Sequence, residues 1–356
     1  MEKLTDICEI QYGYAFDSTC FTEDNSYPPL VRIRDVKRGY SETFYLGRYP
    51  EKYVVHNGDL LVGMDGEFNI ARWKSADALL NQRVCKLTAK EGNNEEYLRF
   101  AMVTALKNIE DKTAFVTVKH LSAKDLNKLE LEMPLLEEQN LRAERLLKLE
   151  KIIELRKKEI KWLEDLVKSR FVEMFGNPII NTKGWPKKRF DEICENLDSR
   201  RKPITASERE AGRYPYYGAS GVVDYVANYI FDEDLLLVSE DGANLLMRST
   251  PIAFSVSGKV WVNNHAHVVR FKEMSMQKYI EIYFSMIDIS DQITGSAQPK
   301  LNQAKLNAIR FAIPNEALLD EYYDFIKKVD KSKVAVQKSL DETQLLFDSL
   351  MQKYFG

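Results

Sequence analysis

The feature that most constrains the fold is an internal repeat with a constant spacing of 180 residues. Residues 119–134 recur at 299–314, so that Pro134 and Pro314 occupy the same place in the two copies. Residues 169–176 recur at 349–356 with the same offset. A chain that repeats itself at a fixed period builds one supersecondary unit twice. We therefore expect two copies of one module; a duplication that only enlarges a scaffold is the alternative.

Outside these segments the two halves are less alike. Residues 6–9 resemble 192–195, and residues 58–61 resemble 233–236, but no single offset covers both pairs. The repeat is therefore strong in its helical parts, whereas the interiors of the two domains have diverged.

Each copy of the repeat contains a long charged stretch, which runs from about 137 to 175 in the first copy without glycine or proline. Apolar residues recur in it at intervals of seven, a spacing that predicts a helix of about 37 residues, roughly 55 Å long, with a coiled-coil seam. The two helices can bury their seams on each other, and an antiparallel pair is preferred. The alternative is a rod that dimerises two chains. The seam residues are Leu146, Ile153, Ile160, Val167 and Met174 in the first copy and Leu319, Ile326, Leu340, Phe347 and Tyr354 in the second.

Short alternating runs with glycine, proline and asparagine between them predict strands in both domains, for example at 30–36, 59–62, 234–238 and 266–271. Helical windows follow at 95–107 and 277–287. The predicted class is α+β, with two similar globular domains, two long antiparallel helices and a pseudo-twofold internal repeat. The expected boundaries are 1–136 and 177–316 for the globular domains and 137–176 and 317–356 for the long helices.

Charge and cysteine content limit the function classes. The net charge is −3, so a DNA-binding chain of this kind needs local basic patches, a basic partner, or both. The four cysteines form no CxxC pair, which indicates free thiols in a reducing cytoplasm and no zinc site. Neither a long apolar window nor a signal peptide is recognised, so we expect a cytoplasmic protein without a membrane span.

Loops of both domains carry side chains that suit contacts with bases and phosphates. A basic patch on its own is more often a solvated surface, and the occurrence of such loops in both copies favours DNA contact. The predicted DNA-binding residues of the first domain are Arg32, Arg34, Lys37, Arg38, Glu67, Phe68, Asn69, Gln82 and Arg83. Those of the second are Arg200, Arg201, Lys202, Tyr216, Tyr217, Ser220, Asn244, Gln298 and Lys300.

Motifs for catalysis are missing from the sequence. It contains no GxGxxG after a strand, no GxxxxGK[ST] and no HExxH, and residues 177–180 lack the aromatic side chain that stacks a flipped base. His265 and His267 lie two residues apart on a predicted strand, with no acidic residue placed beside them by the pattern. A structural or DNA-contacting role is therefore favoured over metal ligation, and we expect neither catalytic nor metal-binding residues.

Several segments resemble the specificity subunit of type I restriction-modification systems. They are the end of the first helix at 171–178 (Phe-Val-Glu-Met-Phe-Gly-Asn-Pro), the segment 134–139 (Pro-Leu-Leu-Glu-Glu-Gln), and the strings at 30–35 and 215–221. The second copy departs from the family pattern at 314–319, where Pro-Asn-Glu-Ala-Leu-Leu stands in place of the family's usual Pro-Pro-Leu-Glu-Glu-Gln signature.

The resemblance implies a subunit without an active site or a bound cofactor. It implies that each recognition domain reads one half of a split double-stranded DNA target in the major groove, while the helices set the gap. The implied partners are two methylation subunits, which use S-adenosyl-methionine to modify adenine, and restriction subunits, which use ATP and magnesium. The alternative function is a structural coiled-coil adaptor whose globular ends bind proteins.

Overall fold

The computed structural model describes residues 1–112, 119–295 and 297–356, and the chain divides into two units. The first unit comprises Met1–Arg156 and Lys338–Gly356, and the second comprises Lys157–Gln337. Each unit contains one α+β domain together with part of α5 (Leu136–Phe175) and part of α9 (Glu316–Phe355).

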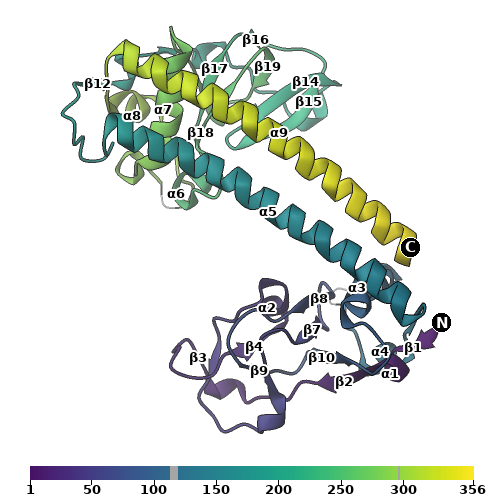
Figure 1. Cartoon of the computed structure of the whole chain (residues 1–356). Helices are drawn as coiled ribbons and strands as arrows, with labels where there is room; N and C mark the ends of the chain where they lie inside the picture. The colour runs from purple at the N-terminus through teal and green to yellow at the C-terminus, as the bar shows by residue number, and fades with distance from the viewer. Residues whose placement is uncertain (113–118, 296) are drawn as a thin grey trace. The chain divides into compact units, whose positions relative to one another are not determined.

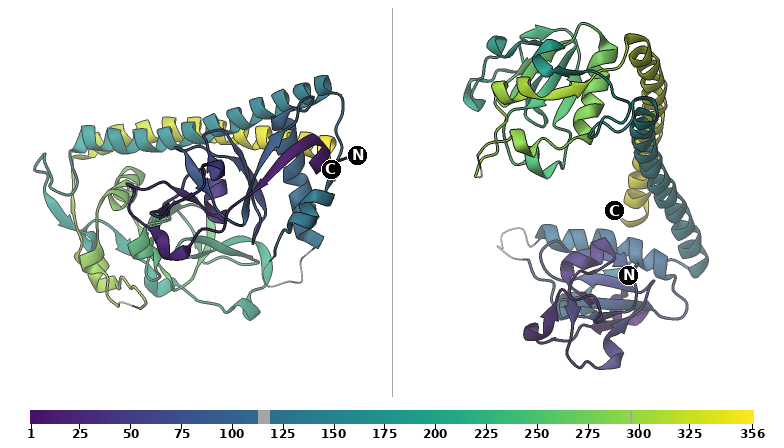
Figure 2. Two further views of the ribbon diagram at one scale, coloured as in Figure 1. Left: turned by 90° about the horizontal axis from the view of Figure 1, so that it is seen from below. Right: turned by 90° about the vertical axis from the view of Figure 1, so that its left-hand side faces the viewer.

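The first unit is built on an antiparallel sheet in the order β2-β10-β7-β8. Its central strand β7 (Leu60–Gly63) is buried along its whole length. Helix α3 (Glu95–Lys112) packs against β8 and β10, and α2 (Ile33–Arg38) packs against β7 and β8; the right-hand view in Figure 2 shows α3, in blue, lying along the sheet. The remaining elements are β1 (Glu2–Lys3), α1 (Leu4–Ile7), β2 (Cys8–Tyr12), β3 (Phe21–Thr22), β4 (Leu30–Val31), β5 (Phe44–Tyr45), β6 (Val54–Val55), β8 (Asn69–Arg72), β9 (Ala78–Leu80), β10 (Val84–Ala89), α4 (Ala123–Lys128) and β11 (Glu130–Leu131).

The second unit repeats this plan with the sheet β13-β20-β17-β18, whose central strand β17 (Leu235–Ser239) is again fully buried. Helix α7 (Met274–Met286) packs against β17 and β18 (Figure 1). The remaining elements are β12 (Lys187–Arg189), β13 (Glu195–Asn196), β14 (Ala211–Gly218), β15 (Gly221–Val226), β16 (Phe231–Asp232), α6 (Asn244–Met247), β18 (Ala253–Val256), β19 (Lys259–Val262), β20 (Ala266–Arg270), α8 (Gln303–Ala308) and β21 (Arg310–Ala312).

The likeness of the two domains extends to their smaller sheets. In the first domain β4 and β6 flank β9, with β4 parallel and β6 antiparallel to it; β14 and β16 flank β19 in the same way. The two-stranded pair β1-β11 likewise corresponds to β12-β21. The prediction of an α+β fold with two similar halves is confirmed.

Helices α5 and α9 pack together in each unit, and each is 40 residues long. In the second unit the pair is antiparallel: the Tyr322 hydroxyl donates a 2.9 Å hydrogen bond to the Val167 carbonyl oxygen, and Lys333, further along α9, pairs with the earlier Glu164 on α5. In the first unit Arg145 donates a 3.2 Å hydrogen bond to the hydroxyl of Tyr354. The predicted seam is confirmed by its buried residues, which include Leu146, Ile153, Val167, Met174, Leu319, Ile326, Leu340 and Tyr354.

One predicted strand is wrong in part. The strand covers Leu30–Val31, Arg32 is the extended N-cap residue, and Ile33–Arg38 form helix α2. The Asp35 carboxylate accepts a 2.9 Å hydrogen bond from the backbone N–H of Arg32, which caps the start of the helix, and Gly39 ends it with a left-handed φ of 79°. These local hydrogen bonds favour the helix over continuation of the strand.

Within the described ranges, no helix combines the length and the apolar character that crossing a membrane requires.

Candidate nucleic-acid interface

A concave surface of the first domain gathers most of the side chains predicted there. It encloses about 660 Å³ and is lined by α2, the loop around Gly66 and the turn at 81–83. Seven predicted residues line it: Arg32, Arg34, Lys37, Glu67, Asn69, Gln82 and Arg83. Phe16, Ser18, Phe21, Ile33, Asp65 and Asn81 complete the surface, which we call the domain 1 groove. The groove therefore combines cations, amides and aromatic rings in one hollow.

Ion pairs between side chains of the domain 1 groove are weak, because these side chains are exposed to solvent. Lys37 and Glu67 form a 3.1 Å ion pair in which each side chain is 70% exposed. Arg34 donates a 3.3 Å hydrogen bond to Thr43 and lies 3.7 Å from Asp35. Exposed pairs of this kind contribute little to stability, so an incoming phosphate or base edge can replace them.

Two predicted residues of the first domain lie outside the groove lining. Phe68 is 7% exposed and packs in the hydrophobic core of the domain. Arg38 lies near the end of α2, 3.5 Å from Glu42. Phe68 therefore supports the Gly66 loop from beneath, whereas its neighbours Glu67 and Asn69 line the groove.

The turn Asn81-Gln82-Arg83 has a backbone conformation that is unusual for residues with a side chain. The backbone of Arg83 has a φ of 72°, a left-handed conformation that costs a residue with a side chain about 1–2 kcal/mol. Its guanidinium contacts the Asp65 carboxylate at 3.6 Å and a ring nitrogen of His120 at 2.9 Å. Non-glycine residues in this conformation often occur at functional sites.

Two amide groups of the groove have an unsatisfied oxygen. The side-chain oxygens of Asn69 and Asn81 are buried and have no hydrogen-bond partner in the described structure. An unpaired buried acceptor is costly, and such groups often await a ligand or a water molecule. Both belong to the lining of the domain 1 groove.

The predicted residues of the second domain are not all equally accessible. Lys202, Ser220, Gln298 and Lys300 are exposed. Arg201 is 14% exposed and donates 2.7 Å hydrogen bonds to Glu240 and to the carbonyl oxygen of Ala266. Arg200 pairs with Glu233 at 2.8 Å and lies over the ring of Phe231.

The aromatic and amide residues predicted in this domain are mostly engaged within it. Tyr216 is buried, and its hydroxyl donates to the carbonyl oxygen of Ile204 at 3.3 Å. The half-buried Tyr217 packs near Phe254. Asn244 stabilises its own loop, because its amide donates a 3.0 Å hydrogen bond to the Thr250 carbonyl oxygen and its side-chain oxygen accepts one from the Thr250 N–H.

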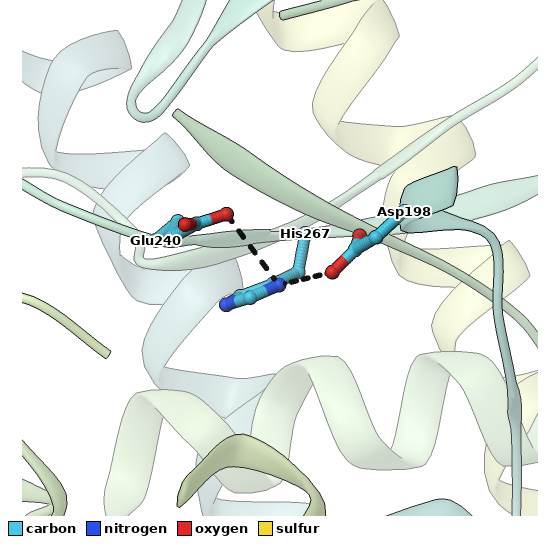
Figure 3. A group of neighbouring side chains, drawn as sticks. All are labelled: Asp198, Glu240 and His267. Atoms are coloured by element: carbon cyan, nitrogen blue, oxygen red, sulfur yellow. Dashed lines mark hydrogen bonds and ion pairs between the residues drawn. The ribbon is translucent and has the colours of Figure 1, made fainter. Parts of the chain in front are cut away.

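A buried ionic network lies beneath the loops of the second domain (Figure 3). His267 is 1% exposed, with Nδ1 2.6 Å from an oxygen of Asp198 and 3.7 Å from Glu240. Its Nε2 lies 2.8 Å from the Leu301 carbonyl oxygen. The sequence pattern led us to expect no acidic partner for His267, and this expectation was wrong. Asp198 and Glu240 come from distant segments of the chain, which sequence spacing alone cannot place beside the histidine.

The geometry of this network fits an ionic cluster better than a metal site. The ligand atoms of Asp198, Glu240 and His267 lie within 4.8 Å of one another. However, both ring nitrogens of His267 already face oxygen atoms, and Glu240 is paired with Arg201 at 2.7 Å and Lys300 at 3.2 Å. Cationic side chains therefore neutralise the carboxylates.

The network also sets the protonation of its carboxylates. Burial raises the pKa of Asp198, but hydrogen bonds from His267 and from the Val268 backbone N–H, together with nearby Arg201, outweigh this effect and leave the pKa below its ordinary value. For Glu240, burial is likewise outweighed by Arg201, His267 and Lys300, so its pKa is also lowered. Both carboxylates are ionised at neutral pH.

His120 and Asp65 of the first domain, and His265 and Asp241 of the second, were not among the predicted site residues. Asp65 forms an isolated bridge with His120, and Asp241 forms one with Lys300. His120 and Lys300 are separated by the 180-residue offset of the repeat, so comparison of the two copies held the signal that could have found them.

Comparison with known proteins shows the family. The family described as type I restriction modification DNA specificity domain matches residues 1–165 and 182–343. The chain is 43% identical over 145 residues to the type I restriction enzyme EcoBI specificity subunit of Escherichia coli, a match that covers 40% of this chain and 31% of that relative. It is 23% identical over 306 residues to the MjaIX specificity subunit of Methanocaldococcus jannaschii, covering 77% and 71%.

Solved structures support the same fold. A crystal structure of the type I restriction-modification system S subunit from M. genitalium has a TM-score of 0.61 at 16% identity, covering 100% of this chain and 95% of that one. A structure from work on complex assembly and conformational transition of the type I system has a TM-score of 0.52 at 15% identity, covering 99% and 96%. Because the family matches most of the sequence, the chain belongs to the family of type I restriction-modification DNA specificity proteins.

Proposed function

We propose that this chain reads a split double-stranded DNA target and directs adenine methylation and restriction by partner subunits. The observation that carries the proposal is the domain 1 groove, where seven predicted side chains line one hollow in a member of this family. The curated relatives are named as specificity subunits of type I restriction enzymes. The chain itself supplies recognition and no catalysis.

The chemistry of the groove suits a base edge in the major groove. Arg32, Arg34 and Lys37 supply cations for phosphates or for guanine, and Asn69 and Gln82 supply amides that suit adenine. Phosphate contacts position a protein on DNA, while contacts to base edges determine the sequence that it reads. The first domain would therefore read one half-target, and the second domain the other.

The proposed division of labour follows the boundaries predicted from the sequence. Residues 1–136 and 177–316 read the two half-targets, and the helices at 137–176 and 317–356 set the number of unread base pairs between them. Two methylation subunits, which use S-adenosyl-methionine, and restriction subunits, which use ATP and magnesium, are the proposed partners. Partner subunits around the DNA would also compensate for the net charge of −3 on this chain.

Methylation mapping tests this proposal. The full chain, co-expressed with its cognate methylation subunit, is expected to give methylated adenines in one bipartite sequence. Exchange of residues 1–136 for those of another specificity subunit is expected to change one half-target and leave the other unchanged. Insertion of one heptad into both helices is expected to lengthen the gap by roughly 10 Å, or about three base pairs.

Three outcomes contradict the proposal. Loss of any sequence preference in the presence of the partner would favour the adaptor hypothesis instead. A change in both half-targets on exchange of one domain would exclude independent reading, and an unchanged gap after heptad insertion would exclude the role of the helices as a spacer.

A further inference from the structure

Backbone hydrogen bonds that recur in both recognition domains align several residues of one domain with residues of the other. In the first domain the N–H of Met64 donates to the Arg83 carbonyl oxygen at 2.9 Å, and the carbonyl oxygen of Met64 accepts from Leu121 at 2.7 Å. In the second domain Glu240 makes the same two bonds, from its N–H to His265 at 2.9 Å and from Leu301 to its carbonyl oxygen at 2.8 Å. Arg83 therefore corresponds to His265.

A second set of contacts supports the same correspondence. Cys85 pairs with Val62 on β7, as His267 pairs with Val238 on β17. The N–H of Gly66 donates to the Lys119 carbonyl oxygen at 2.9 Å, as that of Gly242 donates to Pro299 at 3.0 Å. The turn Asn81-Gln82-Arg83 in the first domain thus has a counterpart in the second, Asn263-Asn264-His265, which we call the domain 2 turn.

Each turn is held by an aspartate at the same place. The Asp65 carboxylate lies 3.6 Å from Arg83, and the Asp241 carboxylate lies 2.8 Å from Nδ1 of His265. Arg83, which also contacts His120, and His265 are each 50% exposed, so part of each side chain stays accessible. Because Nδ1 of His265 faces the Asp241 carboxylate, Nε2 is the ring nitrogen left for another partner.

The backbone of the domain 2 turn rests on the buried ionic network. Arg201 donates hydrogen bonds to the carbonyl oxygens of Asn264 at 3.4 Å and of Ala266 at 2.7 Å, one on each side of His265. The side chain of Asn263 accepts a 2.8 Å hydrogen bond from the His265 N–H. Asn264 is exposed, so a fixed backbone presents an accessible amide beside the imidazole.

We propose that Asn264 and His265 are specificity-determining residues for the half-target of the second domain, which they contact through purine base edges. The proposal rests on the proposed function and deepens it, because the sequence pattern left His265 between a structural and a DNA-contacting role and did not single out Asn264. The Asn264 amide offers a donor and an acceptor that match N7 and N6 of adenine. Nε2 of His265 faces the neighbouring base edge, and Asp241 and Arg201 are positioning residues.

The correspondence also shows that the residues beneath the two turns differ chemically between the two domains. The first-domain counterparts of Glu240 and His267 are Met64 and Cys85, and Cys85 pairs with Tyr12 where His267 contacts Asp198. Neutral side chains therefore stand in the first domain at the places where Glu240 and His267 form ion pairs in the second, while Asp65 contacts Arg83 in the first turn. The same backbone turn is held in place by different chemistry in the two halves.

The test uses the full chain with its methylation subunit and a library of duplexes with randomised positions, read by mapping of methylated adenine. Wild-type protein first defines the two half-targets, which checks the proposed function by itself. Asn264→Ala and His265→Ala are each expected to reduce discrimination at one or two base pairs of the second half-target by about ten-fold, with the first half-target unchanged. Asn228→Ala, an exposed asparagine of the same domain, is the matched control and is expected to change neither half.

Two further variants separate positioning from packing. Asp241→Ala is expected to weaken the same base preference as His265→Ala, whereas Asp241→Asn retains an oxygen that accepts from Nδ1 and is expected to restore most of it. If the wild type reads a bipartite target but both Ala variants read the same second half as the wild type, the inference is overturned and the proposed function stands. If the wild type itself reads no such target, the proposed function fails first.

Discussion

The buried hydroxyl of Tyr322 on α9 donates a 2.9 Å hydrogen bond to the carbonyl oxygen of Val167 on α5. Burial raises the pKa of Tyr322, so its hydroxyl is protonated and acts as a donor at neutral pH. The aromatic ring packs against Phe171 and Phe175 at centroid distances of 5.8 and 5.1 Å. One side chain thus links the two helices through both a polar and an apolar contact.

Replacement of this hydroxyl tests the helix pairing. Tyr322→Phe keeps the ring and removes the donor, so we expect a loss of about 0.5–1.5 kcal/mol in the free energy of unfolding. Urea titration followed by circular dichroism measures the change. Tyr225→Phe, at a side chain that is 55% exposed, is the control and is expected to unfold like the wild type. Equal stability of Tyr322→Phe and wild type would show that the hydrogen bond contributes nothing net.

Backbone strain at Arg83 predicts that stability and recognition can be separated. Arg83→Gly relieves a left-handed conformation and is expected to raise the free energy of unfolding by up to about 1 kcal/mol. The same variant removes the guanidinium from the domain 1 groove, so discrimination in the first half-target is expected to fall about ten-fold. Thermal unfolding and methylation mapping measure the two effects on one protein.

The conservative variant completes that experiment. Arg83→Lys retains the charge and the strained backbone but lacks the planar fork that bonds a guanine at two atoms. It is expected to match the wild-type melting temperature and to lose discrimination nearly as Arg83→Gly does. A marked drop in the stability of Arg83→Gly would contradict the interpretation that the side chain is retained for contact rather than for folding.

The ionic network predicts a specific dependence of stability on pH. The pKa values of Asp198 and Glu240 are lower in the folded protein than their ordinary values of about 3.9 and 4.3. Their contribution to stability is therefore complete above those ordinary values and is lost as the pH falls through the lower folded values. The melting temperature of the wild type should fall more steeply below about pH 4 than that of Asp198→Asn.

Comparison of the wild type with Asp198→Asn isolates the contribution of this carboxylate to stability from the contributions of the other carboxylates in the chain. Asp198→Asn is expected to be less stable than wild type at pH 7, and the difference should narrow on acidification. A difference that stays constant from pH 7 to pH 3 would exclude an electrostatic role for Asp198, whose partners are His267 and Arg201.

Burial also predicts that three of the cysteine thiols react slowly with an alkylating reagent. Burial raises the pKa of the Cys8 and Cys194 thiols to about 12, and it raises that of Cys85 as well. Because the thiolate is the reactive form, native protein at pH 7.5 should leave these three thiols unmodified by iodoacetamide. Mass spectrometry of the peptides measures the modification, and protein unfolded in guanidinium, where all thiols react, is the control. Rapid labelling of Cys85 in the native protein would show that the sheet opens locally.

The sequence predicted the helical repeat well because helices α5 and α9 depend on local periodicity and on a seam that recurs without insertion. It did less well inside the domains. The sequence likeness of residues 58–61 to 233–236 places Leu60 with Leu235, whereas the strand pairing of β7 and β17 places Leu60 with Leu236. In short diverged segments, sequence similarity can match the wrong residues, whereas hydrogen bonds to neighbouring strands set the true register of a strand.

Tertiary contacts explain the remaining differences at the candidate site. Seven of the side chains predicted in the first domain share one groove, because the loops that carry them follow elements around one sheet. Phe68 lies between Glu67 and Asn69 but packs into the core, since alternate side chains of an extended segment face opposite ways. The partners of His267 come from residues 198 and 240, and no spacing rule brings three such distant segments together.

The different supports under the two turns have an evolutionary consequence. In the first domain the turn is backed by the neutral side chains of Tyr12, Met64 and Cys85, and a change at Arg83 leaves its partner Asp65 still paired with His120. A turn tied through Arg201 to Asp198, Glu240 and His267 cannot lose one member without leaving another buried ion unmatched. We therefore expect the first domain to acquire new DNA targets by single substitutions. The second domain is expected to change its target only when several residues change together or when the whole domain is exchanged.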